Sequence, residues 1–488
     1  MKRPTRWYDY ITINIYWFGL TTLSQTNGLV FPLLVQGFVG EETKGTFFGN
    51  LRLWSLMVAL LVQSFMGMMS DRSTLRWGRR RPFIFLGTLA NLVFIAALGF
   101  SAGLEGMTGY WILFALAIML QLGANTAHGA EQGLIPDLVP EDKRGRFSGI
   151  KAVLEIPLPV ILVAFAIGPL IAKGNLWGGL FIAMGILALC MLITMLVPEQ
   201  RLEIKPPEFD WKPFLRLLMM TGLFTAVILG MGEAVKQLGN VLSADQSVNT
   251  LILTFGLLGA AAMAIAVALG VTGSIRLGLG DATRRNPSFT WWVVNRLAFL
   301  IGVNNLAGFA VYFLQGRLGY PEEKAAGPAS QLMMVVGVLI LLSALPSGWL
   351  SDRFGHKRLV AISGGIAAIG TLVLILTTNL TVIYVGGCII GAATGLFFTS
   401  NWALGTELVP KKEAGRYLGI SNLAGAGAGA VGAYIGGPIA DLFTVRVPEV
   451  PGLGYVVLFA IYGFLFVFSI LALRGVKLID RNRDVLQE

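Results

Sequence analysis

The sequence is poor in charge and in cysteine. Only 13% of its 488 residues are charged and 55% are hydrophobic, which excludes an ordinary soluble globular domain. Its two cysteines, Cys190 and Cys388, fall inside apolar stretches, where a small hydrophobic role is favoured over a disulfide or metal site. The sequence has no phosphate-binding loop, metal-ligand cluster or nucleophile triad. ATP-driven pumping and hydrolysis therefore have no support, and we expect no enzyme activity, cofactor or metal.

Long apolar runs are what the chain does contain. They recur along its whole length, and each is long enough to cross a bilayer core of about 30 Å at ~1.5 Å per residue. The sequence therefore predicts an all-α polytopic membrane protein. The fourteen expected segments are 11–36, 47–69, 83–103, 110–136, 148–172, 176–197, 214–235, 249–275, 289–316, 329–350, 359–378, 381–406, 416–441 and 453–473.

A polar stretch after the sixth segment divides the chain. Two extra segments follow it, and the uninterrupted apolar part of 214–235 is only about 16 residues long, which is short for a span. A surface-lying or re-entrant pair is therefore the alternative to two crossings. The predicted regions are a six-helix bundle at 1–197, a linker with two extra helices at 198–288, a second six-helix bundle at 289–474 and a tail at 475–488.

The basic residues lie in short clusters between the apolar runs. With the N-terminus inside, 30 of the 37 Lys and Arg residues fall in or beside inside loops. The positive-inside rule explains the net charge of +10 better than nucleic-acid binding, which needs a basic soluble face. We expect a multi-pass protein of the plasma (inner) membrane with both termini in the cytoplasm and no nucleic-acid partner.

Two motifs occur twice. The motif at 348–358 repeats the motif that begins at Gly67, with four extra residues between Asp71 and Gly78 in the first copy, and 137–150 aligns with 407–420 without gaps. The chain thus contains two copies of one six-helix unit, and both place these loops on the same side. The halves therefore run parallel, related by an axis along the membrane normal. The shared positions, here called the latch residues, are Gly67, Asp71, Arg72, Gly78, Arg79, Arg80, Gly348, Asp352, Arg353, Gly355, Lys357 and Arg358.

The chemistry of the latch residues predicts contacts that hold helix ends together. Gly67 and Gly348 remove a side chain where helices can approach closely, and the glycines that follow permit a tight turn. The aspartates can cap a helix start or pair with the arginine that follows each of them. Such contacts are breakable. The alternative is an ordinary tight turn made basic by the positive-inside rule.

The repeated pattern Gly-x-x-x-Asp-Arg-x-Gly-x-Lys-Arg resembles the signature of the major facilitator superfamily. The resemblance covers nearly the whole chain apart from about 214–275. The first copy, at 70–84, and Ile135-Pro136-Asp137-Leu138 are similar to the glycoside–cation symporters, the plant sucrose carriers and their bacterial relatives. This resemblance implies a fold of twelve helices plus two. It also implies that the latch residues hold the cytoplasmic side shut in one state and do not bind substrate.

Ionisable residues at membrane depth are functional candidates. The fourth segment is the most polar, because Gln121, Asn125, His128 and Gln132 form one helical stripe that Glu131 borders. We predict proton coupling at Glu131, His128 and Glu155. The alternatives are a solvated or arginine-paired Glu131 near the helix end, and an ordinary i,i+4 pair between Glu155 and Lys151.

Neutral hydrogen-bonding groups line both first helices of the halves and suit a neutral polyhydroxyl ligand. Gln132 stands where the sucrose-carrier group has an arginine, which puts anchoring of sugar hydroxyls by that arginine in doubt. Arg52 is a weaker candidate, since an arginine near the outer end of a helix can snorkel. The substrate-lining candidates are Asn27, Gln25, Asn125, Gln132, Asn304, Asn305 and Trp402.

Together these features favour a monomeric secondary carrier that moves a neutral sugar or glycoside by proton- or sodium-coupled symport with alternating access. Its partners would be the solute, the coupling ion and the bilayer. Fourteen helices favour a second hypothesis, a drug or lipid-like antiporter. A third is a non-transporting membrane sensor or pigment-assembly factor.

Overall fold

The computed structural model of the protein describes residues 6–199, 209–242, 247–280, 286–409 and 414–477. Residues 410–413 of the repeated stretch 407–420 and most of the predicted tail 475–488 lie outside these residues. Within them the elements are helical: α1 (Asp9–Thr12), α2 (Ile15–Val39), α3 (Lys44–Asp71), α4 (Arg81–Ser101), α5 (Gly106–Glu131), α6 (Leu134–Leu138), η1 (Glu141–Lys143), α7 (Arg144–Glu155), α8 (Pro157–Leu162), the π-helix η2 (Val163–Ile167), α9 (Gly168–Ala172), α10 (Leu176–Thr194), α11 (Lys212–Leu242), α12 (Val248–Leu279), α14 (Pro287–Gly308), α15 (Ala310–Leu318), η3 (Glu323–Ala325), α16 (Ala326–Phe354), α17 (His356–Leu376), α18 (Leu380–Leu408), α19 (Ala414–Arg446), α20 (Leu453–Ala472) and η5 (Leu473–Gly475).

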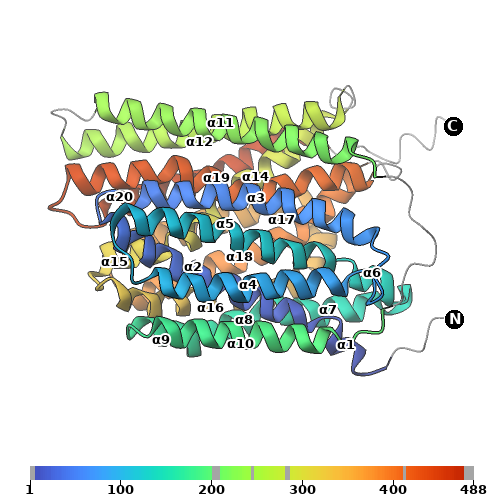
Figure 1. Cartoon of the computed structure of the whole chain (residues 1–488). Coiled ribbons are helices and arrows are strands. Elements are labelled where there is room, and N and C mark those ends of the chain that lie inside the picture. The colour runs from blue at the N-terminus through green and yellow to red at the C-terminus, as the bar shows by residue number, and fades with distance from the viewer. Residues whose placement is uncertain (1–5, 200–208, 243–246, 281–285, 410–413, 478–488) are drawn as a thin grey trace, which may run out of the picture.

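The long helices run side by side as one bundle (Figure 1). Twelve of the described helices are long and apolar enough to cross a membrane, and the bent pair α14 and α15 makes a thirteenth span. Helix α2 is also 25 residues long and lies in the same bundle, but its Thr, Ser, Gln and Asn residues lower its hydropathy below that of the others. Each of the fourteen expected segments thus coincides with a helix or a broken helix.

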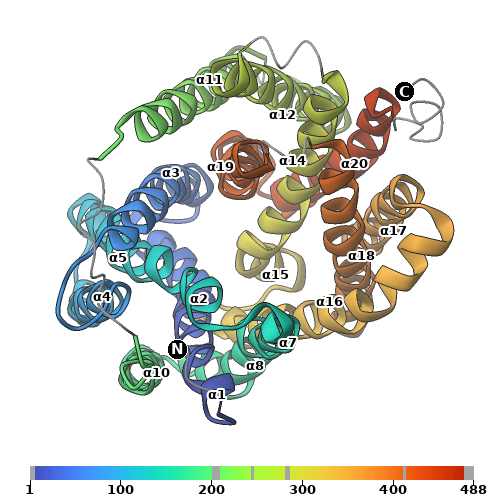
Figure 2. The ribbon, with the colours of Figure 1, turned by 90° about the vertical axis from the view of Figure 1, so that its right-hand side faces the viewer.

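The helices of the two repeated halves form two groups around a central space (Figure 2). Helices α2 to α10 lie on one side, and α14 to α20 lie on the other. The two groups meet where α3 packs against α19 and where α16 packs against α8 and α9. This arrangement places the interior wall of each group opposite the other.

Both extra helices run the length of the bundle on its outside (Figures 1 and 2). Helix α11 has 31 residues and α12 has 32, and both pack against α19. Helix α11 continues through Glu233 and Lys236, whose side chains are exposed near its end. Because polar side chains at a helix end do not shorten the helix, α11 is long enough to span despite its short apolar core.

Short polar residues begin several of these helices. Asn175 accepts a hydrogen bond from the Gly178 amide at the start of α10, and Asn379 does the same for Thr381 in α18. At the start of α14, Asn286 accepts from Phe289 and Pro287 occupies the first turn. These caps satisfy amides that the helix itself leaves without partners.

Two spans are broken. The fifth is divided into α7, α8, a π-helix and α9, and the first break follows Glu155, immediately before Pro157. Proline removes an amide donor and clashes with the preceding turn, which explains this break. The first span of the second half bends by 58° between α14 and α15, after Gly308. Both breaks border the central space.

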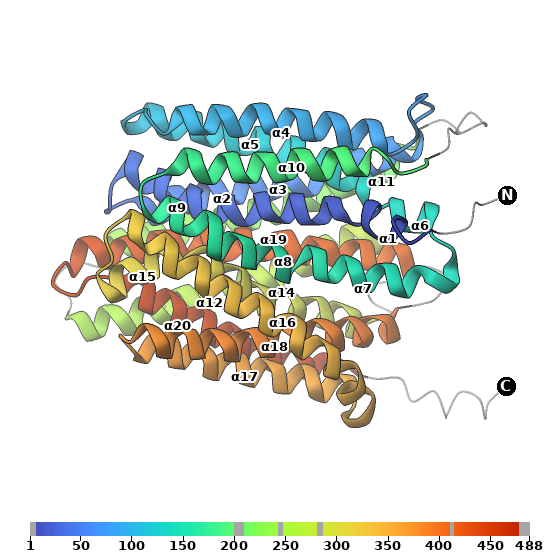
Figure 3. The same cartoon turned by 90° about the horizontal axis from the view of Figure 1, so that it is seen from below.

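The two repeated loops lie at the same end of the bundle, here called the loop end. The junctions from α3 to α4 and from α16 to α17 are both found there, as is α1 (Figure 3). Gly78 and Gly355 adopt φ values of +113° and +88°, which a residue with a side chain rarely adopts. The parallel arrangement expected from the repeat is therefore present.

Candidate functional site

A central cavity of about 940 Å³ lies between the two groups of helices. It extends from Phe48 and Asn27 in the interior to Asp71 and Arg80 at the loop end. The Asp71 side chain is 57% exposed, so the cavity opens at that end. Its volume lies at the upper end of the range of about 300–1,000 Å³ for small-molecule sites.

Most of the predicted substrate-lining residues reach this cavity. Gln25 and Asn27 come from α2, Asn125 from α5, Gln132 from the end of α5, and Asn304 from α14. They are joined in the wall by neutral groups that include Thr21, Ser24, Ser55, Gln63, Ser64 and Gln121. The wall is therefore rich in hydrogen-bonding groups without charge.

Two predicted residues lie outside the cavity wall. Asn305 is buried, and its amide donates to the carbonyls of Ile301 at 2.9 Å and Ala428 at 3.0 Å. Trp402 is 43% exposed, and its ring lies 5.6 Å from the Arg296 guanidinium carbon. Successive residues in a helix point about 100° apart, which explains why Asn304 lines the cavity while Asn305 does not.

The three predicted proton-coupling residues lie close together around Trp17. His128 and Glu155 line the cavity. Glu131 is 1% exposed, and neither of its carboxyl oxygens has a hydrogen-bond partner in the described part of the chain. The ring of His128 lies 5.0 Å from that of Trp17, and its Nε2 lies 3.2 Å from Gln132 Nε2.

Lys151 links this group on its other side. Its Nζ lies 3.6 Å from Glu155 Oε2 and 3.6 Å from the centre of the Trp17 ring. The pair with Glu155 is the i,i+4 contact that the sequence already offered as an alternative. What the spacing could not show is that α2, α5 and α7 bring Lys151 together with Trp17 near Glu131 and His128.

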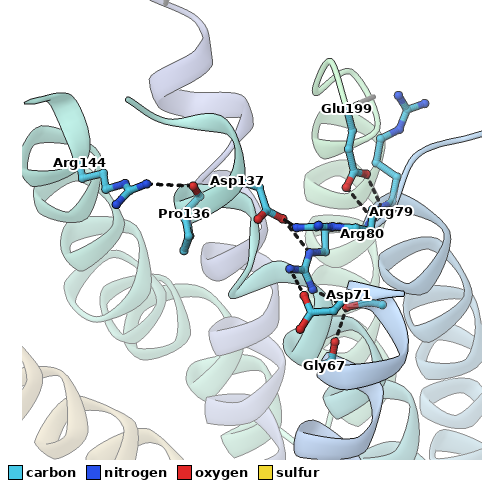
Figure 4. A network of polar contacts seen from close by, with 10 residues as sticks. Gly67, Asp71, Arg79, Arg80, Pro136, Asp137, Arg144 and Glu199 are labelled. Carbon is cyan, nitrogen blue, oxygen red and sulfur yellow. Dashed lines mark hydrogen bonds and ion pairs between the residues drawn. The ribbon is translucent and has the colours of Figure 1, made fainter. Parts of the chain in front are cut away.

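The first copy of the latch residues forms a polar network at the loop end (Figure 4). Arg80 contacts Asp71, and its Nε donates to Asp137 Oδ2 at 3.0 Å. Arg79 also pairs with Asp137. The sequence offered Arg72 as the partner of Asp71. In the structure Asp71 pairs with Arg80, which lies eight residues further along the chain. These partners all belong to the first half of the chain.

Glu199 completes the network by capping α4. Its carboxylate accepts hydrogen bonds from the amides of Arg80 at 2.7 Å and Arg81 at 3.0 Å. Burial raises the pKa of Glu199 above its usual value, although the amide hydrogen bonds act in the opposite direction. Glu199 lies 118 residues from Arg81 along the chain, so no local pattern indicated this cap.

The second copy makes different contacts. Asp352 is exposed and makes no ion pair within the described residues. His356 instead contacts Ser351 and lies 3.2 Å from Glu407, and Lys357 Nζ donates to the Val476 carbonyl at 2.6 Å. Among the described residues, no atom lies within 4 Å of a Cβ built at Gly348, whereas a Cβ at Gly67 would meet the Gly129 carbonyl at 3.5 Å. In this part of the chain the expected helix contact is therefore found at Gly67 and not at Gly348.

The opposite end of the bundle, here called the far end, is closed by contacts between the halves. Tyr312 Oη donates to the Pro32 carbonyl at 2.7 Å, and Lys44 Nζ donates to Gln315 Oε1 at 3.0 Å. Asp441 of α19 accepts hydrogen bonds from the amides of Gly45 at 2.8 Å and Thr46 in the first turn of α3. The cavity is therefore open at one end and closed at the other.

Asp441 and Lys44 were not among the predicted site residues. A signal was present for Asp441, since it is the single acidic residue in the glycine-rich sequence of α19. Lys44 gave no such signal because it begins α3 next to a loop, where a lysine is ordinary.

Comparison with known proteins identifies the family. A family model described as Major Facilitator Superfamily matches residues 16–317 and 296–484. Myo-inositol transporter 2 of Schizosaccharomyces pombe is 28% identical over 145 residues, which are 28% of this chain and 26% of that protein. A sucrose transport protein of Arabidopsis thaliana is 29% identical over 110 residues, or 19% of this chain and 18% of its own. The matched stretches thus span about a quarter or less of these relatives.

A solved structure shares the fold over almost the full length. The crystal structure of a peptide transporter in complex with alafosfalin superposes with a TM-score of 0.65, covering 98% of this chain and 97% of its own, at 16% sequence identity. This agreement confirms the predicted all-α polytopic fold. With the family model and the twelve apolar helices, it shows that the chain belongs to the Major Facilitator Superfamily and is a multi-pass membrane transporter.

Proposed function

We propose that the protein is a proton-coupled symporter for a hydroxylated solute of the sugar class. The observation that carries this proposal is the position of Glu131 beside a cavity that is open at one end, as a buried carboxyl group to which no described residue donates a hydrogen bond. Solute and proton would bind to adjacent parts of one site, and the two halves would then rock around it.

The wall of the cavity supports the choice of solute. Gln25, Asn27, Gln121, Asn125 and Asn304 each offer both a donor and an acceptor, and this combination matches hydroxyl groups. Two of the relatives are transporters of myo-inositol and of sucrose, and both of these solutes are polyhydroxyl compounds. They agree with the chemistry of the wall.

The surroundings of Glu131 support the proton. A carboxylate buried without a hydrogen bond carries a large desolvation cost, so we assign Glu131 a proton in this conformation. Lys151 lies near enough for its charge to act on Glu131. When the proton leaves, Lys151 can turn from Glu155 towards Glu131 and stabilise the carboxylate. His128, in the cavity wall, offers the proton a route to water.

In an alternating-access mechanism, each end of the bundle faces one side of the membrane. Because the basic clusters lie at the loop end, we propose that this end and both termini face the cytoplasm of a cell with the protein in its plasma membrane. The open cavity would then make this the inward-open state of a carrier that we expect to be a monomer. In the outward-open state the loop end would close, and the latch residues of the two halves would then make their contacts. The predicted regions 1–197, 198–288, 289–474 and 475–488 remain the proposed domain boundaries.

Proton flux in proteoliposomes tests this proposal. A pH-sensitive dye is trapped inside, and neutral and acidic solutes of the sugar class, among them sucrose, myo-inositol and glucuronate, are added outside without an imposed gradient. Symport predicts that the lumen acidifies with the transported solute. Glu131→Gln is expected to abolish this acidification but to retain exchange of solute at equal concentrations, because a glutamine imitates the protonated carboxyl.

Glu105→Gln is the matched control, since Glu105 is exposed in the loop before α5, and it should behave like the parent. Acidification that persists in Glu131→Gln would refute the proton site. Lumen acidification that accompanies efflux of an apolar cation from the lumen would select an antiporter. Solute uptake that depends on a sodium gradient and causes no acidification would select sodium coupling, and folded protein without any flux would favour a sensor or assembly factor.

A further inference from the structure

Arg52 lies in the interior wall of the cavity, where the two halves meet. It belongs to α3 of the first half, and its guanidinium reaches α14 of the second half. Nη1 donates to Asn305 Oδ1 and Nη2 donates to the Asn304 carbonyl, both at 3.3 Å. The charged group thus points across the cavity floor and does not turn to the membrane surface as a snorkelling arginine would.

No carboxylate of the described residues balances the charge of Arg52. Among the charged residues of the cavity wall, Asp71 pairs with Arg80 and Glu155 pairs with Lys151. Arg52 has no carboxylate partner in the described part of the chain. A cation at membrane depth without a counter-ion is costly, and such groups mark substrate or ion sites.

The backbone around Arg52 is shaped to admit it. A side-chain carbon at Gly308 would lie 1.6 Å from Nη1, and one at Gly429 would lie 3.2 Å from Nη2. Gly308 is also the last residue before the 58° bend between α14 and α15. Two glycines from different helices therefore leave space for the guanidinium at the cavity.

The remaining donors define the ligand. A guanidinium has five N–H donors in a planar fork that fits a carboxylate or phosphate. Within the described residues, hydrogen bonds use two of the nitrogens of Arg52, both at 3.3 Å. Asn27 and Asn304 lie in the same wall and can bind hydroxyl groups. One anionic group and several hydroxyls would therefore fit together.

We propose that Arg52 binds an anionic group of the transported solute, which is then an acidic sugar derivative and not the neutral sugar expected from the sequence. This inference rests on the proposed function for the solute class. Carboxylate and phosphate share the chemistry that a guanidinium recognises, and separate ligands distinguish them.

Ligand-dependent thermal stability of the purified protein tests the site without requiring transport. Glucose, glucuronate and glucose 6-phosphate form a matched set that differs only in the charged group. We expect glucuronate or glucose 6-phosphate to raise the melting temperature at concentrations where glucose does not. Arg52→Gln should weaken acid binding by about tenfold or more, and Arg52→Lys, which keeps the charge but loses the fork, should weaken it less.

Arg446→Gln removes an exposed arginine at the far end of α19 and should leave binding unchanged. Equal stabilisation by glucose and by the acids in the parent protein would overturn the anion site, and this measurement needs no variant to fold. So would an Arg52→Gln protein that still discriminates for the acids. Proton-coupled flux of a neutral sugar would refute the anion site but uphold the proposed function. Binding of the acids without any proton-coupled flux would uphold the anion site but refute the proposed function.

Discussion

At the scale of the residue, Arg80 bonds to several partners at the loop end. Its side chain is 6% exposed and joins Asp71, Asp137 and Ser70, the last at 2.6 Å from Nη1. A lysine has one charged group on a flexible stem and cannot reach three partners in this geometry. Arg80→Lys should therefore lower the free energy of unfolding by about 1–2 kcal/mol, a value reduced for the solvent around Asp71. Thermal unfolding of the purified protein measures it.

Arg76→Lys is the matched control because Arg76 is exposed in the same loop. Equal melting temperatures for the two variants would show that the network adds no stability.

The partners of Arg80 also show what the sequence could not predict at this scale. The motif indicated that Asp71 would pair with a basic residue, but Asp137 is 57 residues from Arg80 and comes close only after α5 and α6 have packed. The same holds for Glu131. Its depth in the membrane could be predicted from hydropathy, whereas its lack of a hydrogen-bond partner depends on the packing of three helices.

At the scale of the element, the contact between α3 and α19 joins the halves through small residues. A side-chain carbon at Gly49 would lie 2.3 Å from the Ala433 carbonyl, and one at Gly437 would lie 2.1 Å from the Gly45 carbonyl. Backbones this close pack well only without side chains between them. Gly49→Ala should force the helices apart and cost about 1–3 kcal/mol, measured as a lower melting temperature.

Gly185→Ala in α10 makes the same chemical change at a position where no atom of the described residues lies within 4 Å of the added carbon. It should keep or slightly raise stability, because alanine favours the helix over glycine. If Gly49→Ala were as stable as Gly185→Ala, the close contact would not hold the halves together.

The lengths of apolar runs predicted the helices well, because membrane thickness limits them from outside. Hydropathy does not show where a span breaks. Pro157 is a sequence signal for the break in the fifth span, but Gly308 gives no comparable signal for the bend after α14. At this bend Gly308 leaves space for Arg52, which comes from the other half of the chain.

At the scale of the whole molecule, the repeat predicted two parallel halves but not which end of the cavity is open. Two nearly equivalent copies can close either end, so the state depends on contacts between halves that no single copy contains. At the far end these contacts include like charges. Glu41 of the first half and Glu322 of the second lie near Lys44, whose Nζ is 2.5 Å from Glu41.

This arrangement predicts that closure of the far end depends on pH. Burial, and then the negative charges of Glu41 and Glu323, raise the pKa of Glu322 above its ordinary 4.5, although Lys44 opposes them. The closed form therefore binds the proton more tightly than an open form in which Glu41 and Glu322 separate. Its stabilisation is complete below the ordinary pKa and is lost as pH rises through the raised one. Lowering the pH from 7 to 5 should favour the closed far end by less than about tenfold, since Glu322 is half-exposed.

Spin labels at Glu42→Cys and Glu449→Cys, with Cys190 and Cys388 replaced by serine, would report a shorter distance at low pH. Glu322→Gln should remove this dependence while Glu105→Gln keeps it, and a pH response that survives in Glu322→Gln would assign it to another group.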